Sequence, residues 1–177
     1  KMVDNAEAST RINGISQAAL TAVQATREAI FNLSLPQLNE LGLVAATHDW
    51  MKEQIQEKHF IKTSLEGEDL VLNIDENTRV LLFRSLRELM MNVVKHAQAK
   101  NLKINFQTKD DDLVITVEDD GVGFHYNAQM VRLQGKGFGL FSIQERLSDL
   151  GGTMEVTSAP GQGTSIELKT PLNKALA

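Results

Sequence analysis

Four polar residues that could bind a metal and a phosphate group share one side of an expected helix. Glu88, Asn92, Lys95 and His96 fall within an arc of roughly 100° when each residue advances by about 100°. The neutral amide oxygen of an Asn suits Mg²⁺, and the ammonium of a Lys suits a phosphate. A solvent-exposed polar face would give the same pattern, so this helix indicates a site only together with other motifs.

Three glycine clusters follow this helix in chain order. They are Asp119-Asp-Gly121-Val-Gly123, Gly137-Phe-Gly139-Leu140 and Gly161-Gln-Gly163-Thr164. Glycine lets backbone N–H groups approach an anion closely, and a glycine turn that opens a helix adds the helix N-terminus as a phosphate site. A single cluster of this kind marks many turns, but three in this order predict a nucleotide-phosphate site.

In these motifs the chain resembles the catalytic, ATP-binding part of a sensor histidine kinase, in particular the subfamily that includes the nitrate/nitrite sensors. The helix from Glu88 to His96 matches the N box of that family, and the three clusters match its glycine boxes, over roughly residues 76–170. The wider superfamily shares these boxes. The segment from Leu35 to Leu43, which resembles the linker after the dimerisation helices, favours the kinase branch.

The resemblance implies two cofactors, ATP and Mg²⁺, and a role for each polar residue. Asn92 would be the Mg²⁺ ligand, Lys95 and His96 would contact phosphates, and Glu88 would be catalytic, polarising the attacking group or a metal-bound water. Asp119 would accept a hydrogen bond from the adenine amino group. A structural role remains the alternative for three of these residues: Glu88 as a surface charge, His96 as a neutral residue at the cleft edge, and Asp119 as a turn cap.

The glycine boxes are expected to form the rest of the nucleotide site. Gly121, Gly123, Gly137 and Gly139 would shape the lid and admit the phosphates, with Leu140 beside them in the second box. Thr164 would close the pocket from the third box. Asp120 is a better candidate than Asp119 for the residue that caps the turn.

The pattern of elements predicts two units and a short tail. Residues 1–42 are interpreted as a remnant of the second dimerisation helix, from Asp4 to Leu33, with its linker; packing of that helix on the domain's own core is the alternative. Residues 43–172 are expected to form the ATP-binding domain, and 173–177 the tail. Mixed strands and helices predict an α/β fold, a two-layer sandwich with helices on one face of a mixed sheet, and the resemblance implies that it is of the Bergerat type.

The expected phosphoacceptor is missing from the first helix. Residues 1–34 contain no His, and the only His-Asp pair is His48-Asp49, which lies where the family has an ordinary helix of the ATPase domain. We therefore interpret the chain as a fragment whose parent is phosphorylated on a His outside it. The resemblance implies that this parent is a homodimer formed through a helical bundle, passes the phosphoryl group to a response regulator, and is membrane-anchored with this part in the cytoplasm.

Composition is compatible with this interpretation. A net charge of −5 without a basic stripe argues against a nucleic-acid partner, and the absence of Cys excludes disulfides and thiolate metal sites. Two other functions stay open: an anti-sigma-factor-type serine kinase, which would lack the linker at Leu35 to Leu43, and a nucleotide-binding module without catalysis, for which Glu88 would be unnecessary.

Overall fold

The computed structural model describes residues 15, 38–126 and 138–172. The chain divides into two compact units, Lys1–Pro36 and Gln37–Ala177. Apart from Ile15, the expected helix from Asp4 to Leu33 lies outside the described residues, as do Gly137 of the second glycine box and the tail. The fold and the site below belong to the second unit.

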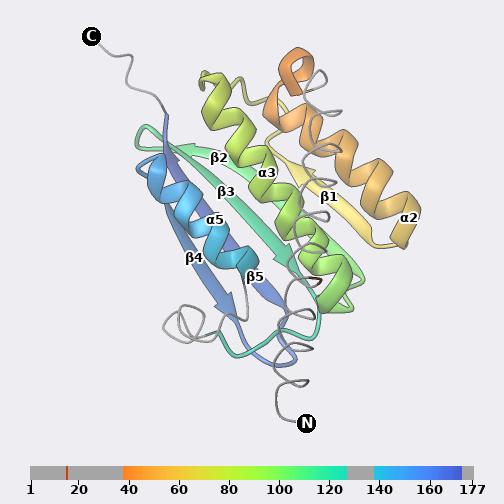
Figure 1. Cartoon of the computed structure of the whole chain (residues 1–177). Helices are drawn as coiled ribbons and strands as arrows, with labels where there is room; N and C mark the ends of the chain where they lie inside the picture. The colour runs from red at the N-terminus through yellow and green to blue at the C-terminus, as the bar shows by residue number, and fades with distance from the viewer. Residues whose placement is uncertain (1–14, 16–37, 127–137, 173–177) are drawn as a thin grey trace. The chain divides into compact units, whose positions relative to one another are not determined.

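A five-stranded mixed sheet forms the base of this unit, with helices over one of its faces (Figure 1). The strand order is β1-β2-β3-β5-β4; β1 pairs with β2 in parallel and every other pair is antiparallel. The strands are β1 (Lys62–Glu66), β2 (Asn101–Lys109), β3 (Asp112–Asp119), β4 (Thr153–Ser158) and β5 (Thr164–Pro171). This confirms the predicted α/β sandwich with a mixed sheet.

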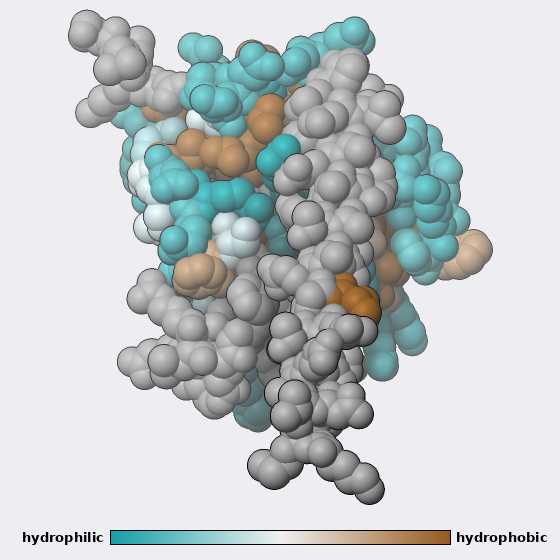
Figure 2. All heavy atoms as spheres, in the orientation of Figure 1, coloured by the Kyte–Doolittle hydropathy of each residue, from teal (hydrophilic) through white to brown (hydrophobic). Residues whose placement is uncertain are grey.

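Apolar side chains alternate along β2 and build the core against the helices. Leu102, Ile104 and Phe106 of β2 are fully buried while the residues between them are not, as expected for a sheet packed on one face. Most of the described surface in Figure 2 is hydrophilic, with hydrophobic residues in small groups. The apolar residues therefore lie mainly in the core beneath.

Helix α3 (Glu76–Asn92) carries the N-box residues. An Asp followed by Glu76 predicts an N-cap at Asp75, and the structure confirms it: Asp75 Oδ1 accepts a hydrogen bond of 2.9 Å from the Thr78 backbone N–H. The helix continues into a π-helical turn, η2 (Val93–Ala97), and ends at Gln98 in the left-handed conformation. Figure 1 shows α5 (Phe138–Asp149) beside α3 on the same face of the sheet.

A further helical stretch covers the β1 side of the sheet. Residues 38–50 are helical and continue through η1 (Met51–Gln56) and α2 (Glu57–His59). The sequence pattern predicts a helix only from Leu43 to about Glu57, which is too short, because buried Leu38 already belongs to the helical stretch. The alternating residues from Phe60 to Leu65 predict a strand that begins at Phe60, which is wrong: Phe60 takes a left-handed φ of 57° and ends the helix, so β1 begins at Lys62. None of the helices described here is both long enough and apolar enough to span a bilayer.

Candidate functional site

A cavity of about 510 Å³ lies between the C-terminal part of α3, the start of α5 and the adjoining ends of β3 and β5. Much of its wall is apolar, from residues such as Val117, Val122 and Ile166. The site residues predicted from the sequence that line it are Asn92, His96, Asp119, Gly123, Gly139, Leu140 and Thr164. A largely apolar slot with a few polar groups at defined points is the usual form of a small-molecule site.

Asp119 is the last residue of β3 and lies opposite Thr164 of β5 in the strand register. Its Oδ1 accepts a 2.8 Å hydrogen bond from the Gly121 backbone N–H, and the Thr164 side chain also bonds to the carboxylate. Burial raises the pKa of Asp119 above the ordinary value, although both hydrogen bonds act to lower it. The side chain is therefore a half-buried acceptor fixed in the cavity wall.

Asp120 has different surroundings from its neighbour. Its carboxylate is exposed and accepts hydrogen bonds from the backbone N–H groups of Lys100 and Asn101, both 2.8 Å, and from Asn101 Nδ2 at 2.6 Å. The bonds from Asn101 are the main reason that the pKa of Asp120 lies below its usual value. This residue ties the first glycine box to the start of β2, and it does not line the cavity.

The N-box residues separate where α3 passes into the π-helical turn. Asn92 ends α3 and lines the cavity, as does His96, whereas Lys95 is exposed and is not part of the lining. At about 100° per residue Lys95 projects beside Glu88, which does not line the cavity either, whereas Asn92 and His96 project on the other edge of the stripe. The single stripe predicted from the sequence therefore holds only in part.

Glu88 lies next to the cavity without lining it. Its Oε2 accepts a 2.7 Å hydrogen bond from the Arg146 guanidinium of α5, and both side chains are largely buried, with 31% of Glu88 and 25% of Arg146 exposed. A Cβ at Gly139 would lie 2.8 Å from Glu88 Oε1 and 3.5 Å from Asn92 Nδ2. Gly139 thus lets the start of α5 approach the N-box helix.

Arg146 was not predicted as a site residue. The sequence did contain an indication that Arg146 lies on the same side of α5 as the second glycine box, because Arg146 follows Gly139 by two helical turns. Nothing in the sequence indicated that this face would meet Glu88, which lies 58 residues earlier.

The glycines of the first and third boxes serve backbone packing. A Cβ at Gly121 would lie 2.3 Å from the Ala97 carbonyl oxygen, so this glycine joins the first box to the end of η2 and does not line the cavity. Gly123, with φ +58°, packs against the turn before β5, where its Cβ would lie 2.1 Å from the Ala159 carbonyl oxygen. The two glycine boxes form one continuous wall as a result.

Gly123→Ala should therefore lower the melting temperature clearly more than Gly161→Ala. Both glycines have positive φ, so each alanine carries the left-handed penalty of about 1 kcal/mol. Of the two, only the new Cβ at position 123 would clash with backbone atoms, since a Cβ at Gly161 meets nothing within 4 Å. Thermal unfolding of the two variants measures the difference; equal melting temperatures would contradict the packing of the two boxes.

Ser158 is a second residue that the sequence analysis missed. Its hydroxyl donates to the Gly163 carbonyl oxygen at 2.9 Å and accepts from the Phe124 backbone N–H at 3.0 Å. It also lies 3.1 Å from the Thr164 hydroxyl, which contacts Asp119. A serine before a Pro-Gly turn has no distinctive pattern, so only the fold shows that it joins the first and third boxes.

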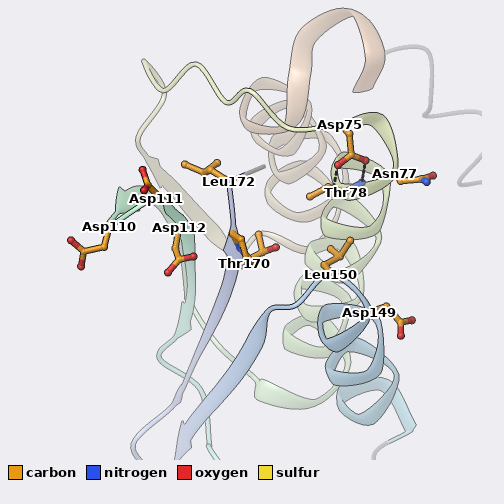
Figure 3. A pocket seen from close by; sticks show the side chains of 11 residues that line it. Asp75, Asn77, Thr78, Asp110, Asp111, Asp112, Asp149, Leu150, Thr170 and Leu172 are labelled. Atoms are coloured by element: carbon orange, nitrogen blue, oxygen red, sulfur yellow. Dashed lines mark hydrogen bonds between the residues drawn. The ribbon is translucent and has the colours of Figure 1, made fainter. Parts of the chain in front are cut away.

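A second hollow, of about 660 Å³, lies near the opposite end of β3 (Figure 3). Its lining includes Asp75, the run from Asp110 to Asp112, and Asp149. These carboxylates would repel a triphosphate. Asp75 caps α3 and Asp112 pairs with Lys169 at 2.9 Å. Across the part of the chain that the structure describes, no group of three or more His, Asp or Glu could hold a metal ion.

Comparison with known proteins identifies the family. Residues 77–174, more than half of the chain, match the family model described as "Histidine kinase-, DNA gyrase B-, and HSP90-like ATPase". The chain belongs to this family of ATPases.

Its relatives include named sensor kinases. The chain is 32% identical over 154 residues to the signal transduction histidine-protein kinase/phosphatase UhpB of Salmonella typhimurium, covering 87% of this chain and 30% of that protein. It is 27% identical over 172 residues to the oxygen sensor histidine kinase NreB of Staphylococcus carnosus, covering 97% of this chain and 47% of that protein. The chain thus spans less than half the length of either relative.

The fold is also found in solved structures. The histidine kinase domain of the blue-light activated kinase EL346 of Erythrobacter litoralis superposes with a TM-score of 0.66 at 19% identity, covering 83% of this chain and 74% of that one. At this level of identity the likeness concerns the fold.

Proposed function

We propose that this chain is the ATP-binding, catalytic portion of a sensor histidine kinase. The observation that carries the proposal is the cavity that joins the N box to all three glycine boxes, with Asp119 fixed in its wall. The relatives named above are sensor kinases, which supports the same assignment.

The cavity suits ATP in one orientation. The adenine ring enters the apolar part, and its amino group donates to Asp119, which selects adenine because guanine has a carbonyl oxygen at that position. The phosphates then lie toward Asn92, His96 and the start of α5, whose first turn adds the field of a helix N-terminus. Lys95, exposed one residue before His96, would reach the phosphates only by extending its side chain.

The oxygen ligands that the cavity offers fit a Mg²⁺ ion that is held chiefly by the phosphates of the nucleotide. Asn92 offers one amide oxygen at the cavity, and no cluster of three carboxylate or imidazole ligands exists among the described residues. Mg²⁺ keeps several waters and commonly takes one or two protein ligands together with substrate phosphates. When bound, it would supply neutralisation of phosphate charge.

Phosphoryl transfer then depends on placement. An acceptor imidazole nitrogen forms a bond to the γ-phosphorus while the bond to the β–γ bridging oxygen breaks, and ADP leaves with that electron pair. Glu88, next to Asn92 and Gly139, would accept a hydrogen bond from the acceptor imidazole N–H and polarise it.

We further propose that the longer protein works as a homodimer, anchored in a membrane with this portion in the cytoplasm, and passes the phosphoryl group to a response regulator.

A nucleotide-binding module without catalysis is the second candidate, and one observation favours it. Glu88 is engaged by Arg146 and lies outside the cavity lining, as a purely structural carboxylate would. Transfer assays on Glu88 variants separate the two candidates.

The chain alone should bind ADP or ATP with Mg²⁺ and prefer either to the guanine nucleotide by about tenfold or more, because guanine presents a carbonyl oxygen to Asp119 where adenine presents an amino donor. Calorimetric titration with ADP and GDP measures this preference. Equal affinities would contradict the assignment of the cavity.

The same chain should not phosphorylate itself. His48 and Asp49 form the only His-Asp pair of the sequence, with His48 Nδ1 3.5 Å from Asp49 Oδ1 and both side chains half-exposed, so the pair is accessible. Incubation with radiolabelled ATP and Mg²⁺ should leave it unlabelled. Acid-labile, base-stable phosphate on His48 would overturn our interpretation of the acceptor.

A further inference from the structure

The Glu88–Arg146 ion pair is a direct side-chain bond between the N-box helix α3 and helix α5, which begins in the second glycine box. Arg146 NH2 lies 2.7 Å from Glu88 Oε2, across α3 and α5. Both groups are largely withdrawn from water, so their attraction is screened less than in a surface pair. The bond therefore fixes the rotamer of Glu88.

The pair leaves the two oxygens of Glu88 in different surroundings. Oε2 is held by Arg146, whereas Oε1 faces the Cα of Gly139, where a Cβ would lie only 2.8 Å away. Asn92 Nδ2 borders the same spot at 3.5 Å. Gly139 and Asn92 both line the nucleotide cavity, so Oε1 lies against the cavity wall, although Glu88 itself is not part of the lining.

Among the described residues, Glu88 is the carboxylate with which the Arg146 guanidinium forms a salt bridge. Arg146 Nε is buried and makes no hydrogen bond. The contact of Arg146 in this part of the chain is therefore directed at one oxygen of one carboxylate.

We propose that Arg146 is a positioning residue for phosphoryl transfer, holding Glu88 by Oε2 so that Oε1 stays available to the acceptor imidazole beside the nucleotide. The inference rests on the proposed kinase function and deepens it. Arg146 acts through Glu88 and touches neither the nucleotide nor the acceptor. Loss of Arg146 leaves the cavity intact and frees Glu88 to leave its working rotamer.

Arg146→Gln should lower the rate of transfer at saturating ATP by about tenfold or more, while the KM for ATP and the affinity for ADP stay within about threefold. Transfer is measured with the full chain and an acceptor helix carrying His, fused upstream of Lys1 or supplied on a second chain. Arg146→Lys should recover part of the rate, because it restores the charge without the planar fork. Glu145→Gln removes one charge of the opposite sign at the exposed neighbouring residue; it is the control for position on α5 and should transfer normally.

The decisive comparison uses two variants together. If Arg146 acts only through Glu88, then Arg146→Gln added to Glu88→Gln should cause no further loss of transfer. If the double variant instead loses the product of the two single losses in transfer rate, the proposal is overturned. Normal transfer by Arg146→Gln alone would also overturn it. A fall in ADP affinity together with transfer would assign Arg146 to the structure of the cavity and also overturn it.

Transfer by the unmodified chain separates a failure of the proposed kinase function from a failure of the role of Arg146. If the unmodified chain binds ADP but transfers no phosphate to the acceptor helix, the proposed kinase function fails, and the role of Arg146 fails with it. If the unmodified chain transfers and Arg146→Gln transfers equally well, only the role of Arg146 fails.

Discussion

Asp119→Asn is expected to weaken adenine nucleotide binding by about ten- to a hundredfold, while Asp120→Asn changes it by no more than a few-fold. In the first variant the Gly121 N–H would hold the new amide oxygen as it now holds Oδ1 of Asp119. The NH₂ group of the new side chain would then face the cavity, where it meets the adenine amino group as donor against donor. Calorimetric titration with ADP and Mg²⁺ measures both variants.

The neighbouring aspartate is the matched control, because the chemical change is the same. Asp120 accepts three hydrogen bonds at the start of β2 and does not line the cavity, so Asp120→Asn should act on the melting temperature. A larger loss of affinity at Asp120 would show that the adenine contact has been assigned to the wrong residue.

Binding should also report the ionisation of Asp119. Burial raises its pKa, so the carboxylate takes up a proton at a higher pH than an ordinary aspartate, and affinity should fall as pH falls through that raised value. The nucleotide phosphates titrate as well, and the same pH series on Asp119→Asn removes their contribution. A pH dependence identical in the two proteins would contradict the role of Asp119.

Local signals account for what the sequence predicted well. The cap at Asp75 needs only Thr78, three residues later, and the apolar run from Leu113 to Val117 predicts a strand that the structure extends to Asp112–Asp119. The glycine boxes indicated the nucleotide cavity because glycine is needed where backbones meet. Gly163 shows this directly, since its Cβ would lie 2.1 Å from the Asp119 carbonyl oxygen.

Features that depend on distant residues or on backbone geometry were not predictable. The sequences of β1 and β2 do not indicate that these strands pair in parallel. The left-handed conformation of Phe60 was not expected either, because a bulky residue rarely adopts it. The cavity meets only the edge of the polar stripe that carries Asn92 and His96, so Lys95 is not part of its lining. Gly121 was expected to admit phosphates, but the fold places it against Ala97.

Asn92 and Glu88 lie one helical turn apart, and their substitutions should separate nucleotide binding from chemistry. Asn92→Ala removes the amide oxygen at the cavity, so it should weaken Mg²⁺-dependent binding of ATP and reduce phosphoryl transfer by about a hundredfold or more. Binding measured in EDTA should change far less. Equal losses with and without Mg²⁺ would mean that Asn92 supports the cavity and does not bind the metal.

Glu88→Gln is the sharper test of catalysis, because Gln keeps an oxygen for Arg146, whereas Ala would leave that guanidinium without its carboxylate. The variant should bind ATP within a few-fold of the unmodified chain and transfer phosphate at least about tenfold more slowly, since polarising the attacking nitrogen matters chiefly in the transition state. Wild-type transfer by Glu88→Gln would show that the charge of Glu88 serves only its bond to Arg146. The catalytic assignment would then fall, and the nucleotide cavity formed by Asp119, Asn92 and the glycine boxes would remain as a binding module.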